Sequence, residues 1–152
     1  MRIFIILLLI FCNSFCIDKL KNKIIIDTKR CTLFFTGNMK FYKISVGYRK
    51  DGKTVTPIGK FEVIGKSKNP PCNLPNVKAK PYSIDKKNPY GKYFIGTSAK
   101  KDSGFNIGIH GTNTPEKIGK KKYISGGCIR MRNEDIGEIF DLVKVNDRVI
   151  IK

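Results

Sequence analysis

The sequence predicts a mainly β protein with one amphipathic α-helix near its C-terminus. Most apolar residues fall in short runs that are rich in β-branched and aromatic side chains and are separated by turn-forming residues, as is typical of strands. In contrast, Ile136, Ile139, Phe140 and Val143 recur at the spacing of one helix face. The chain has 152 residues, which is the size of one domain.

The first half of the chain predicts a run of strands joined by turns. Gly37-Asn38 is a turn dipeptide, and it joins two segments of a hairpin. The ring of Pro57 fixes the φ angle of that residue, whereas Gly59 is free to adopt a wide range of φ angles. Residues 54–63 are therefore expected to form a turn that leads into a strand. A loop is expected at 47–52. The strands before that loop are predicted at 23–27, 31–35 and 39–46.

The second half predicts two central strands, the helix and a final strand. Prolines interrupt 66–90, which leaves room for one short strand within 77–84. In the strand predicted at 105–110, Phe105, Ile107 and Ile109 share one face, so His110 is expected on the opposite, exposed face. Asn133 is the predicted N-cap of the helix. The other elements expected here are a strand at 93–96, a helical turn at 115–118 and a strand at 148–151.

The composition is that of a soluble globular protein, but its charge is unusual. Hydrophobic residues make up 41% and charged residues 28% of the chain, whereas the formal net charge is +18. Such a charge suits a polyanionic neighbour, whether nucleic acid, an anionic membrane face or the acidic polymers of a bacterial envelope. A lysine-rich surface that only keeps the protein in solution is the alternative.

Residues 1–16 are expected to form a secretory signal peptide. Arg2 provides the positive charge, and Ile3–Phe11 is an apolar run of nine residues, too short to span a bilayer. An uncleaved N-terminal anchor is the alternative. Either segment would carry the protein out of the cytoplasm, to the periplasm or the cell envelope.

Three cysteines follow this segment, and export would expose them to oxidising conditions. An odd number predicts one pair and one free thiol. Cys31–Cys72 is the candidate disulfide, and Cys128 is the candidate reactive thiol. The alternative is that Cys31 and Cys72 are both free.

The residues that can carry chemistry lie in two short motifs. One is His110-Gly111, which contains the only histidine, and the other is Ser125-Gly126-Gly127-Cys128-Ile129-Arg130. A thiol is a strong nucleophile as a thiolate, and a nearby imidazole can generate it. Glycines beside the thiol let backbone N–H groups approach a bound carbonyl. Arg130 can hold a substrate carboxylate through two parallel hydrogen bonds.

A buried small cysteine and a core histidine are the structural alternative for Cys128 and His110. That alternative gives no reason for glycines beside the thiol or for an arginine two positions after it. A single histidine with scattered acidic residues provides no cluster of metal ligands, so neither a metal nor another cofactor is expected.

These motifs resemble the signature of the L,D-transpeptidase catalytic domain, the YkuD family. Its pattern is a histidine-glycine pair followed by Ser/Thr-x-Gly-Cys-hydrophobic-Arg or Asn. Thr56-Pro57-Ile58-Gly59-Lys60-Phe61 is similar to a further element of the family. Gly126 departs from the pattern, because many members carry a second histidine there. The resemblance covers 22–152 and implies a β-sandwich-like domain, with the cysteine in a cleft and a flap contributed by 66–90.

The resemblance implies an enzyme that acts on peptidoglycan stem peptides. Cys128 would attack a stem tetrapeptide and release D-alanine, and an amine would then resolve the acyl-enzyme into a 3→3 crosslink. His110 is the implied proton donor and acceptor, and the backbone carbonyl of Gly111 would orient it. The backbone at Gly127 would belong to the oxyanion hole.

Substrate binding is expected for Arg130, Ser125 and Tyr93. The aromatic residues Tyr82, Tyr90 and Phe94 are further candidates to line the cleft.

Several other functions remain open. Water as acceptor would give an L,D-carboxypeptidase, a protein lysine would give an enzyme that attaches proteins to peptidoglycan, and a free D-amino acid would give exchange. Sortases have a far longer His–Cys gap, and papain-like enzymes place the cysteine before the histidine. The non-enzyme alternative is a secreted cationic protein that binds the envelope. No nucleic acid and no stable protein partner is implied.

Overall fold

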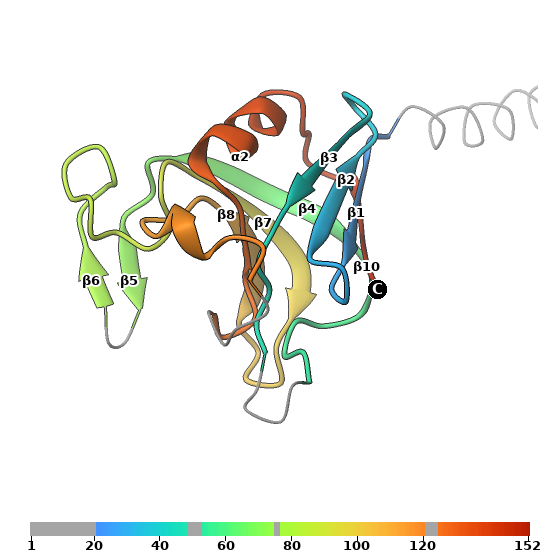
Figure 1. Cartoon of the computed structure of the whole chain (residues 1–152), viewed down its shortest axis with the longest axis horizontal. Coiled ribbons are helices and arrows are strands. Elements are labelled where there is room, and N and C mark those ends of the chain that lie inside the picture. The colour runs from blue at the N-terminus through green and yellow to red at the C-terminus, as the bar shows by residue number, and fades with distance from the viewer. Residues whose placement is uncertain (1–20, 49–52, 75–76, 121–124) are drawn as a thin grey trace, which may run out of the picture.

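The computed structural model describes residues 21–48, 53–74, 77–120 and 125–152 (Figure 1), so the signal peptide predicted at 1–16 lies outside the described residues. None of the helices in these ranges is long and apolar enough to cross a membrane. The elements, in chain order, are β1 (Lys23–Asp27), β2 (Thr32–Phe35), β3 (Lys40–Lys43), β4 (Gly59–Lys68), β5 (Cys72–Leu74), β6 (Val77–Ala79), β7 (Tyr93–Lys100), β8 (Asn106–His110), the 3-10 turn η1 (Pro115–Lys117), β9 (Ile129–Arg130), α2 (Asn133–Phe140) and β10 (Arg148–Ile151).

Eight of the strands form one sheet in the order β3-β2-β1-β10-β4-β7-β8-β9. The sheet curls until its two ends meet (Figure 1): Ser45, just after β3, pairs with Arg130 of β9. The N–H of Ser45 donates to the Arg130 carbonyl at 2.9 Å, and the N–H of Arg130 donates to the Ser45 carbonyl at 2.8 Å. Arg130 therefore lies at the seam of a nearly closed sheet, which leaves few unpaired strand edges there.

The core lies inside this curl and follows from the alternation of the strands. Ile24 and Ile26 of β1 are fully buried, and so are the neighbouring Val149 and, almost entirely, Ile151 of β10. The two strands pair in parallel with Ile24 opposite Val149. Since successive side chains of a strand point to opposite faces, this register directs one apolar row from each strand inward. The predicted fold class, mainly β and sandwich-like with one C-terminal helix, is confirmed.

The predicted N-terminal hairpin is confirmed, with shorter strands than expected. β2 pairs with β3 so that Leu33 lies opposite Tyr42. Cys31, where the second strand was expected to begin, has a φ of 52°, and Met39 has a φ of 57°. These left-handed conformations interrupt the extended backbone, so the strands begin at Thr32 and Lys40.

The strand that carries His110 differs from the expected alternation. Phe105 is 67% exposed and lies outside β8, whereas every residue from Ile107 to His110 is buried. The predicted exposed face of His110 is therefore wrong, because other parts of the fold cover that face too. β7, which pairs with β8, runs to Lys100 and is longer than the strand predicted at 93–96.

The proline-rich segment holds two strands, one of which the sequence did not predict. β5 and β6 pair as a separate small hairpin that projects from the side of the curled sheet (Figure 1). Buried Asn88 ties its base together, because its side-chain amide donates to the carbonyls of Pro70 at 2.8 Å and Lys80 at 2.9 Å. Its side-chain oxygen accepts the N–H of Tyr90 at 2.9 Å.

The C-terminal helix α2 is confirmed, but its predicted cap is wrong. Ile136, Ile139 and Phe140 are buried, as the helical spacing predicted. Arg132 occupies the N-cap position, and no side chain caps the helix. Asn133 is instead the first helical residue, and its buried side chain makes hydrogen bonds elsewhere.

Cys31 and Cys72 are both free, so the candidate disulfide between them is wrong. The two residues lie in separate parts of the fold, since Cys31 precedes β2 in the curled sheet and Cys72 begins β5 in the small hairpin. The Cys31 sulfur lies 3.7 Å from the Thr28 carbonyl and 3.7 Å from the Tyr48 hydroxyl. The thiol is thus held by polar neighbours.

Candidate active site

The two sequence motifs meet because β8 and β9 are adjacent parallel strands. His110 lies opposite Arg130 in their register, and Ile109 lies opposite Ile129. The N–H of Met131 donates to the His110 carbonyl at 2.9 Å. Parallel neighbours need a long connection, and the chain between His110 and Cys128 provides it. The pairing brings both predicted motifs to one edge of the curled sheet.

The imidazole of His110 is held in one orientation by the next residue. Its Nδ1 atom lies 2.6 Å from the carbonyl oxygen of Gly111. A carbonyl only accepts hydrogen bonds, so Nδ1 carries the proton and Nε2 has the free lone pair in the neutral ring. Burial, reinforced by the charge of Arg130, lowers the pKa of His110 from 6.5 to about 3, although the bond to Gly111 opposes this. His110 is thus a neutral acceptor at physiological pH.

Two aromatic rings cover His110, which is only 2% exposed. Phe94, its partner in the register of β7 and β8, stacks on the imidazole with 5.9 Å between ring centroids and 7° between planes. Tyr90 meets the imidazole edge-on at 5.1 Å. Burial raises the pKa of Tyr90 to about 12, with smaller contributions from Cys72 and Cys128, so the phenol stays neutral. Phe94 and Tyr90, two of the candidates to line the cleft, thus both lie against His110.

Cys128 is partly exposed and has a backbone donor beside its sulfur. The N–H of Gly108 donates to Cys128 Sγ at 3.5 Å. A Cβ atom at Gly108 would lie 2.2 Å from the Phe94 ring, so this close arrangement requires glycine. Gly108 was not among the predicted site residues. Its position two residues before His110 on the same strand was the available signal.

The loop before Cys128 is held by hydroxyl groups. Ser125 donates its hydroxyl to the Cys128 carbonyl at 2.7 Å, and the N–H of Gly127 donates to Ser125 Oγ at 3.2 Å. Gly127 has a φ of 125°, which side chains rarely adopt. The hydroxyl of Thr56, from the Thr-Pro element, donates to the Gly127 carbonyl at 2.8 Å. Ser125 therefore braces the loop, and the Thr-Pro element anchors it.

Arg130 presents a buried polar atom that lacks a partner. Its Nε atom has no hydrogen-bond partner within the part of the chain that the structure describes. Burial lowers the pKa of Arg130, while the charge of Cys128 opposes this and shows that the two side chains are electrostatic neighbours. A half-buried guanidinium beside the thiol can receive an anionic group.

Asn133 supports the segment that orients His110, a role that the sequence analysis did not foresee. Its side-chain oxygen accepts the N–H of Lys92 at 2.9 Å, and its amide group donates to the Thr112 carbonyl at 2.8 Å. A Cβ atom at Gly91 or at Gly111 would lie 2.1 Å from the Asn133 oxygen. The amide thus fills the space beside Gly111 and fixes its backbone.

Two predicted aromatic residues lie elsewhere. Tyr93 packs its ring against Phe140 of α2 at 4.9 Å, on the opposite face of β7 from Phe94. Lys86 places its ammonium 4.5 Å from the centre of the Tyr82 ring. Neither contact brings the ring to His110.

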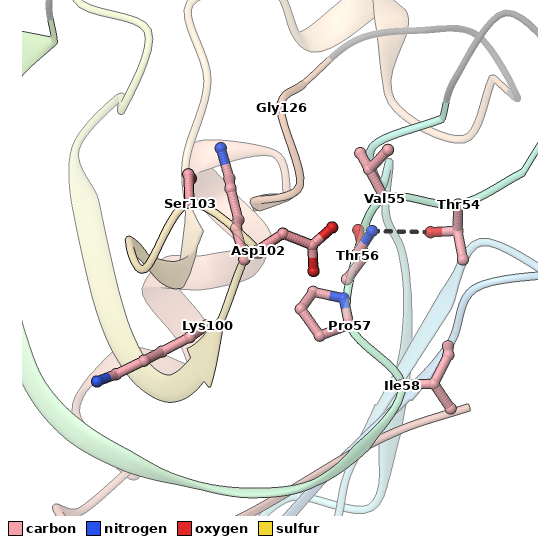
Figure 2. Close-up of a pocket in the computed structure, with 10 residues that line it drawn as sticks. Thr54, Val55, Thr56, Pro57, Ile58, Lys100, Asp102, Ser103 and Gly126 are labelled. Carbon is pink, nitrogen blue, oxygen red and sulfur yellow. Dashed lines mark hydrogen bonds between the residues drawn. The ribbon is translucent and has the colours of Figure 1, made fainter.

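A pocket of about 540 Å³ lies beside the Cys128 loop. Its walls are 54–58 and 100–103, and it reaches Gly126, two residues before Cys128, without including Cys128 itself. In Figure 2, Asp102 points its carboxylate toward Thr56 and Pro57, and Lys100 points away from the pocket. The pocket therefore lies along one side of the Cys128 loop.

The arrangement is suited to acyl transfer. A thiol with a backbone donor, a neutral imidazole with a fixed tautomer and a half-buried guanidinium are brought together by β8 and β9. Among the described residues, no three His, Cys, Asp or Glu side chains form a cluster that could hold a metal ion.

Comparisons with known proteins identify the family to which the chain belongs. The profile of the YkuD family, described as the L,D-transpeptidase catalytic domain, matches 21–151. The chain is 39% identical to the Bacillus subtilis L,D-transpeptidase homologue YqjB over 110 residues, which are 72% of this chain and 57% of YqjB. It is 35% identical to Bacillus subtilis YkuD over 127 residues, 83% of this chain and 62% of YkuD.

The fold is also that of solved L,D-transpeptidases. A crystal structure of an L,D-transpeptidase from Mycobacterium tuberculosis H37Rv matches with a TM-score of 0.63 at 16% identity, covering 87% of this chain and 57% of that one. The chain spans less than two thirds of the length of each of these relatives. Because the family profile matches 21–151, which is most of the chain, the chain belongs to the YkuD family of L,D-transpeptidase catalytic domains.

Proposed function

We propose that this protein is a cell-wall L,D-transpeptidase that forms an acyl-enzyme on Cys128 from a peptidoglycan stem tetrapeptide. The observation that carries the proposal is the 2.6 Å contact between His110 Nδ1 and the Gly111 carbonyl, since it leaves Nε2 as the proton acceptor. Family membership supports the reaction class.

Acylation begins with proton transfer from the Cys128 thiol to His110 Nε2. The resulting thiolate, to which Gly108 donates its N–H, attacks the carbonyl carbon of the third stem residue. The N–H groups of Cys128 and Gly127 hold the oxyanion. For this, the Gly127 N–H exchanges its 3.2 Å bond to Ser125 for the substrate oxygen. The C–N bond then breaks, His110 returns the proton to the amine, and D-alanine leaves.

Arg130 orients the donor peptide. Its partly buried guanidinium, with Nε unpartnered among the described residues, binds a carboxylate of the stem. A charged hydrogen-bond donor that is buried without a partner is costly, and a substrate carboxylate removes that cost. Tyr90, as a neutral phenol beside Cys128, lines the same cleft.

The second half of the reaction transfers the acyl group to an amine. An amine of a second stem attacks the thioester, His110 takes its proton, and the Cys128 thiolate leaves to give a 3→3 crosslink. Water, a free D-amino acid or a protein lysine in place of that amine would give the carboxypeptidase, exchange or attachment reactions.

Export to the cell envelope completes the proposal. Residues 1–16 act as the export signal or anchor, and the net charge of +18 holds the protein near anionic polymers of the wall.

Product analysis tests the proposed function. The full chain is incubated with disaccharide-tetrapeptide, and the products are separated by chromatography and identified by mass. We expect a 3→3 crosslinked dimer and free D-alanine, with neither product from the Cys128→Ala variant. Tripeptide without dimer would replace the transpeptidase by an L,D-carboxypeptidase. No product at all would favour a cationic binding protein.

A further inference from the structure

The pocket beside Gly126 brings opposite charges to the edge of the Cys128 loop. It is formed by the Thr-Pro element on one side and by the turn after β7 on the other. The turn is tight, because the N–H of Lys101 donates to the Phe105 carbonyl at 3.0 Å and the N–H of Gly104 donates to the Lys101 carbonyl at 2.9 Å. Lys101 and Asp102 are therefore presented from a closed backbone turn and not from a long loop.

Lys101 lies directly over the glycines that precede Cys128. A Cβ atom built at Gly126 would be 2.9 Å from Lys101 Nζ, and one built at Gly127 would be 3.2 Å from Lys101 Cε. The ammonium thus rests against the backbone at Gly126, at the end of the pocket nearest the thiol in sequence. Within the described residues, no ion pair engages Lys101 or Asp102.

The side chains of Lys100 and Asp102, which flank Lys101 in the chain, point in different directions. Figure 2 shows that the Asp102 carboxylate enters the pocket beside Pro57, whereas Lys100 points out of it. Thr54 and Thr56 add hydroxyl groups on the facing wall, although the Thr54 hydroxyl already donates to the Gly47 carbonyl and the Thr56 hydroxyl to the Gly127 carbonyl. The ammonium of Lys101 and the carboxylate of Asp102 together match a zwitterionic amino acid, which carries both charges on one carbon.

We propose that this pocket is the subsite for the amino acid that leaves in acylation and for the α-amino acid amine that arrives in transfer, with Lys101 binding its carboxylate. This inference rests on the proposed function. The departing residue and the arriving amine occupy the same position relative to the thioester. Acylation breaks a C–N bond at the carbonyl carbon, and transfer forms a C–N bond at the same carbon. Arg130, which follows Cys128, remains assigned to the donor stem.

The transfer step balances without another reactant. The amine nitrogen attacks the thioester carbonyl carbon, a C–N bond forms, and the C–S bond breaks. One amine proton passes to His110 Nε2 and then to the Cys128 sulfur. Lys101 takes no part in the bond changes. It selects an amine that carries a carboxylate on the same carbon, while Asp102 faces the ammonium group before it loses its proton.

Competition between two acceptors tests Lys101. The full chain is acylated with disaccharide-tetrapeptide and offered isotope-labelled D-alanine or labelled D-alaninamide, which lacks the carboxylate. The readout is the ratio of the two transfer rates. We expect the wild type to prefer D-alanine about tenfold, the effect of one charge-assisted hydrogen bond. Lys101→Met should abolish the preference, and Lys101→Arg should restore it.

Lys100→Met is the matched control, because it removes the same charge from the adjacent residue that points out of the pocket. It should keep the preference for D-alanine. An acyl-enzyme that shows no preference in the wild type, or an unchanged preference in Lys101→Met, would overturn the inference alone. Equal losses in Lys100→Met and Lys101→Met would replace it by a general effect of charge. Failure to form any acyl-enzyme would overturn the proposed function and this inference together.

Discussion

The Nδ1 atom of His110 lies 2.6 Å from the carbonyl oxygen of the adjacent residue, Gly111. In triads with an acidic third member, a carboxylate orients the imidazole and stabilises its charged form. A neutral carbonyl orients the ring with less stabilisation of positive charge. Burial keeps His110 neutral although this contact opposes the shift of its pKa, and the contact leaves Nε2 free to take a proton.

The first prediction concerns the titration of His110. It is the only histidine of the chain, so a ¹³C-histidine-labelled sample gives one imidazole signal. Because burial lowers the pKa of His110 to about 3, that signal should stay at the shift of the neutral ring from pH 8 down to about pH 4.5. Titration near the ordinary value of 6.5 would contradict the buried, neutral imidazole. Urea-unfolded protein, titrating near 6.5, is the control.

The same shift predicts how stability depends on pH. Between pH 6.5 and about 3, the unfolded chain binds a proton on His110 that the folded chain does not. Stability therefore rises with pH in this window, and the contribution of His110 is present above 6.5 and lost as the pH falls toward 3. Urea unfolding at pH 7.5, 6.0 and 5.0 measures it, and His110→Gln should show a smaller loss than the wild type. Equal losses in both proteins would show that His110 is not the cause.

Gly108→Ala should damage both packing and chemistry. The added methyl group would lie 2.2 Å from the Phe94 ring, which stacks on His110. Overpacking of this kind costs about 1–3 kcal/mol of stability. We also expect slower acylation, because the N–H that contacts Cys128 Sγ would move. Gly65→Ala in β4 is the control, since a Cβ atom there meets nothing within 4 Å. Urea unfolding and acylation rates equal to the control would refute the role of Gly108.

Asn133→Ala should weaken the support of the Gly111 carbonyl. The substitution removes the bonds to the Lys92 N–H and the Thr112 carbonyl and leaves both groups without a partner. The Thr112 carbonyl is buried, and an unsatisfied buried group costs about 1–3 kcal/mol. We expect a lower free energy of unfolding, and a lower acylation rate together with an altered His110 ¹³C shift. The exposed Asn73→Ala is the control. A destabilised variant with an unchanged His110 signal would make Asn133 a structural residue only.

Much of the fold could be predicted because alternation and turn residues report local geometry. The strands predicted at 23–27 and 148–151 are present with those bounds, and β8 and β9 place His110 opposite Arg130. The burial of His110 could not be predicted, because Tyr90 and Phe94 cover it from other segments. Strand alternation describes only the strand itself, so it placed His110 on an exposed face.

Other site features depend on long-range contacts that single residues do not reveal. Asn133 is a residue type that often caps helices, yet its side-chain amide forms hydrogen bonds with segments 21 and 41 positions away in sequence. Tyr93 and Phe94 were both candidates for the cleft. Which ring faces His110 is decided by the pairing of β7 with β8 on one side and by the packing of α2 against β7 on the other. Gly108 acts through its backbone N–H, so the only signal in the sequence is its position two residues before His110.

The formation of an acyl-enzyme on Cys128 is the central claim, and time-resolved intact mass spectrometry of the full chain with disaccharide-tetrapeptide measures it most directly. We predict a transient adduct of disaccharide-tripeptide mass, mapped to Cys128 by peptide analysis, and a much slower adduct in His110→Gln. An adduct on Cys31 or Cys72, turnover by Cys128→Ala, or no adduct at any time would contradict the account.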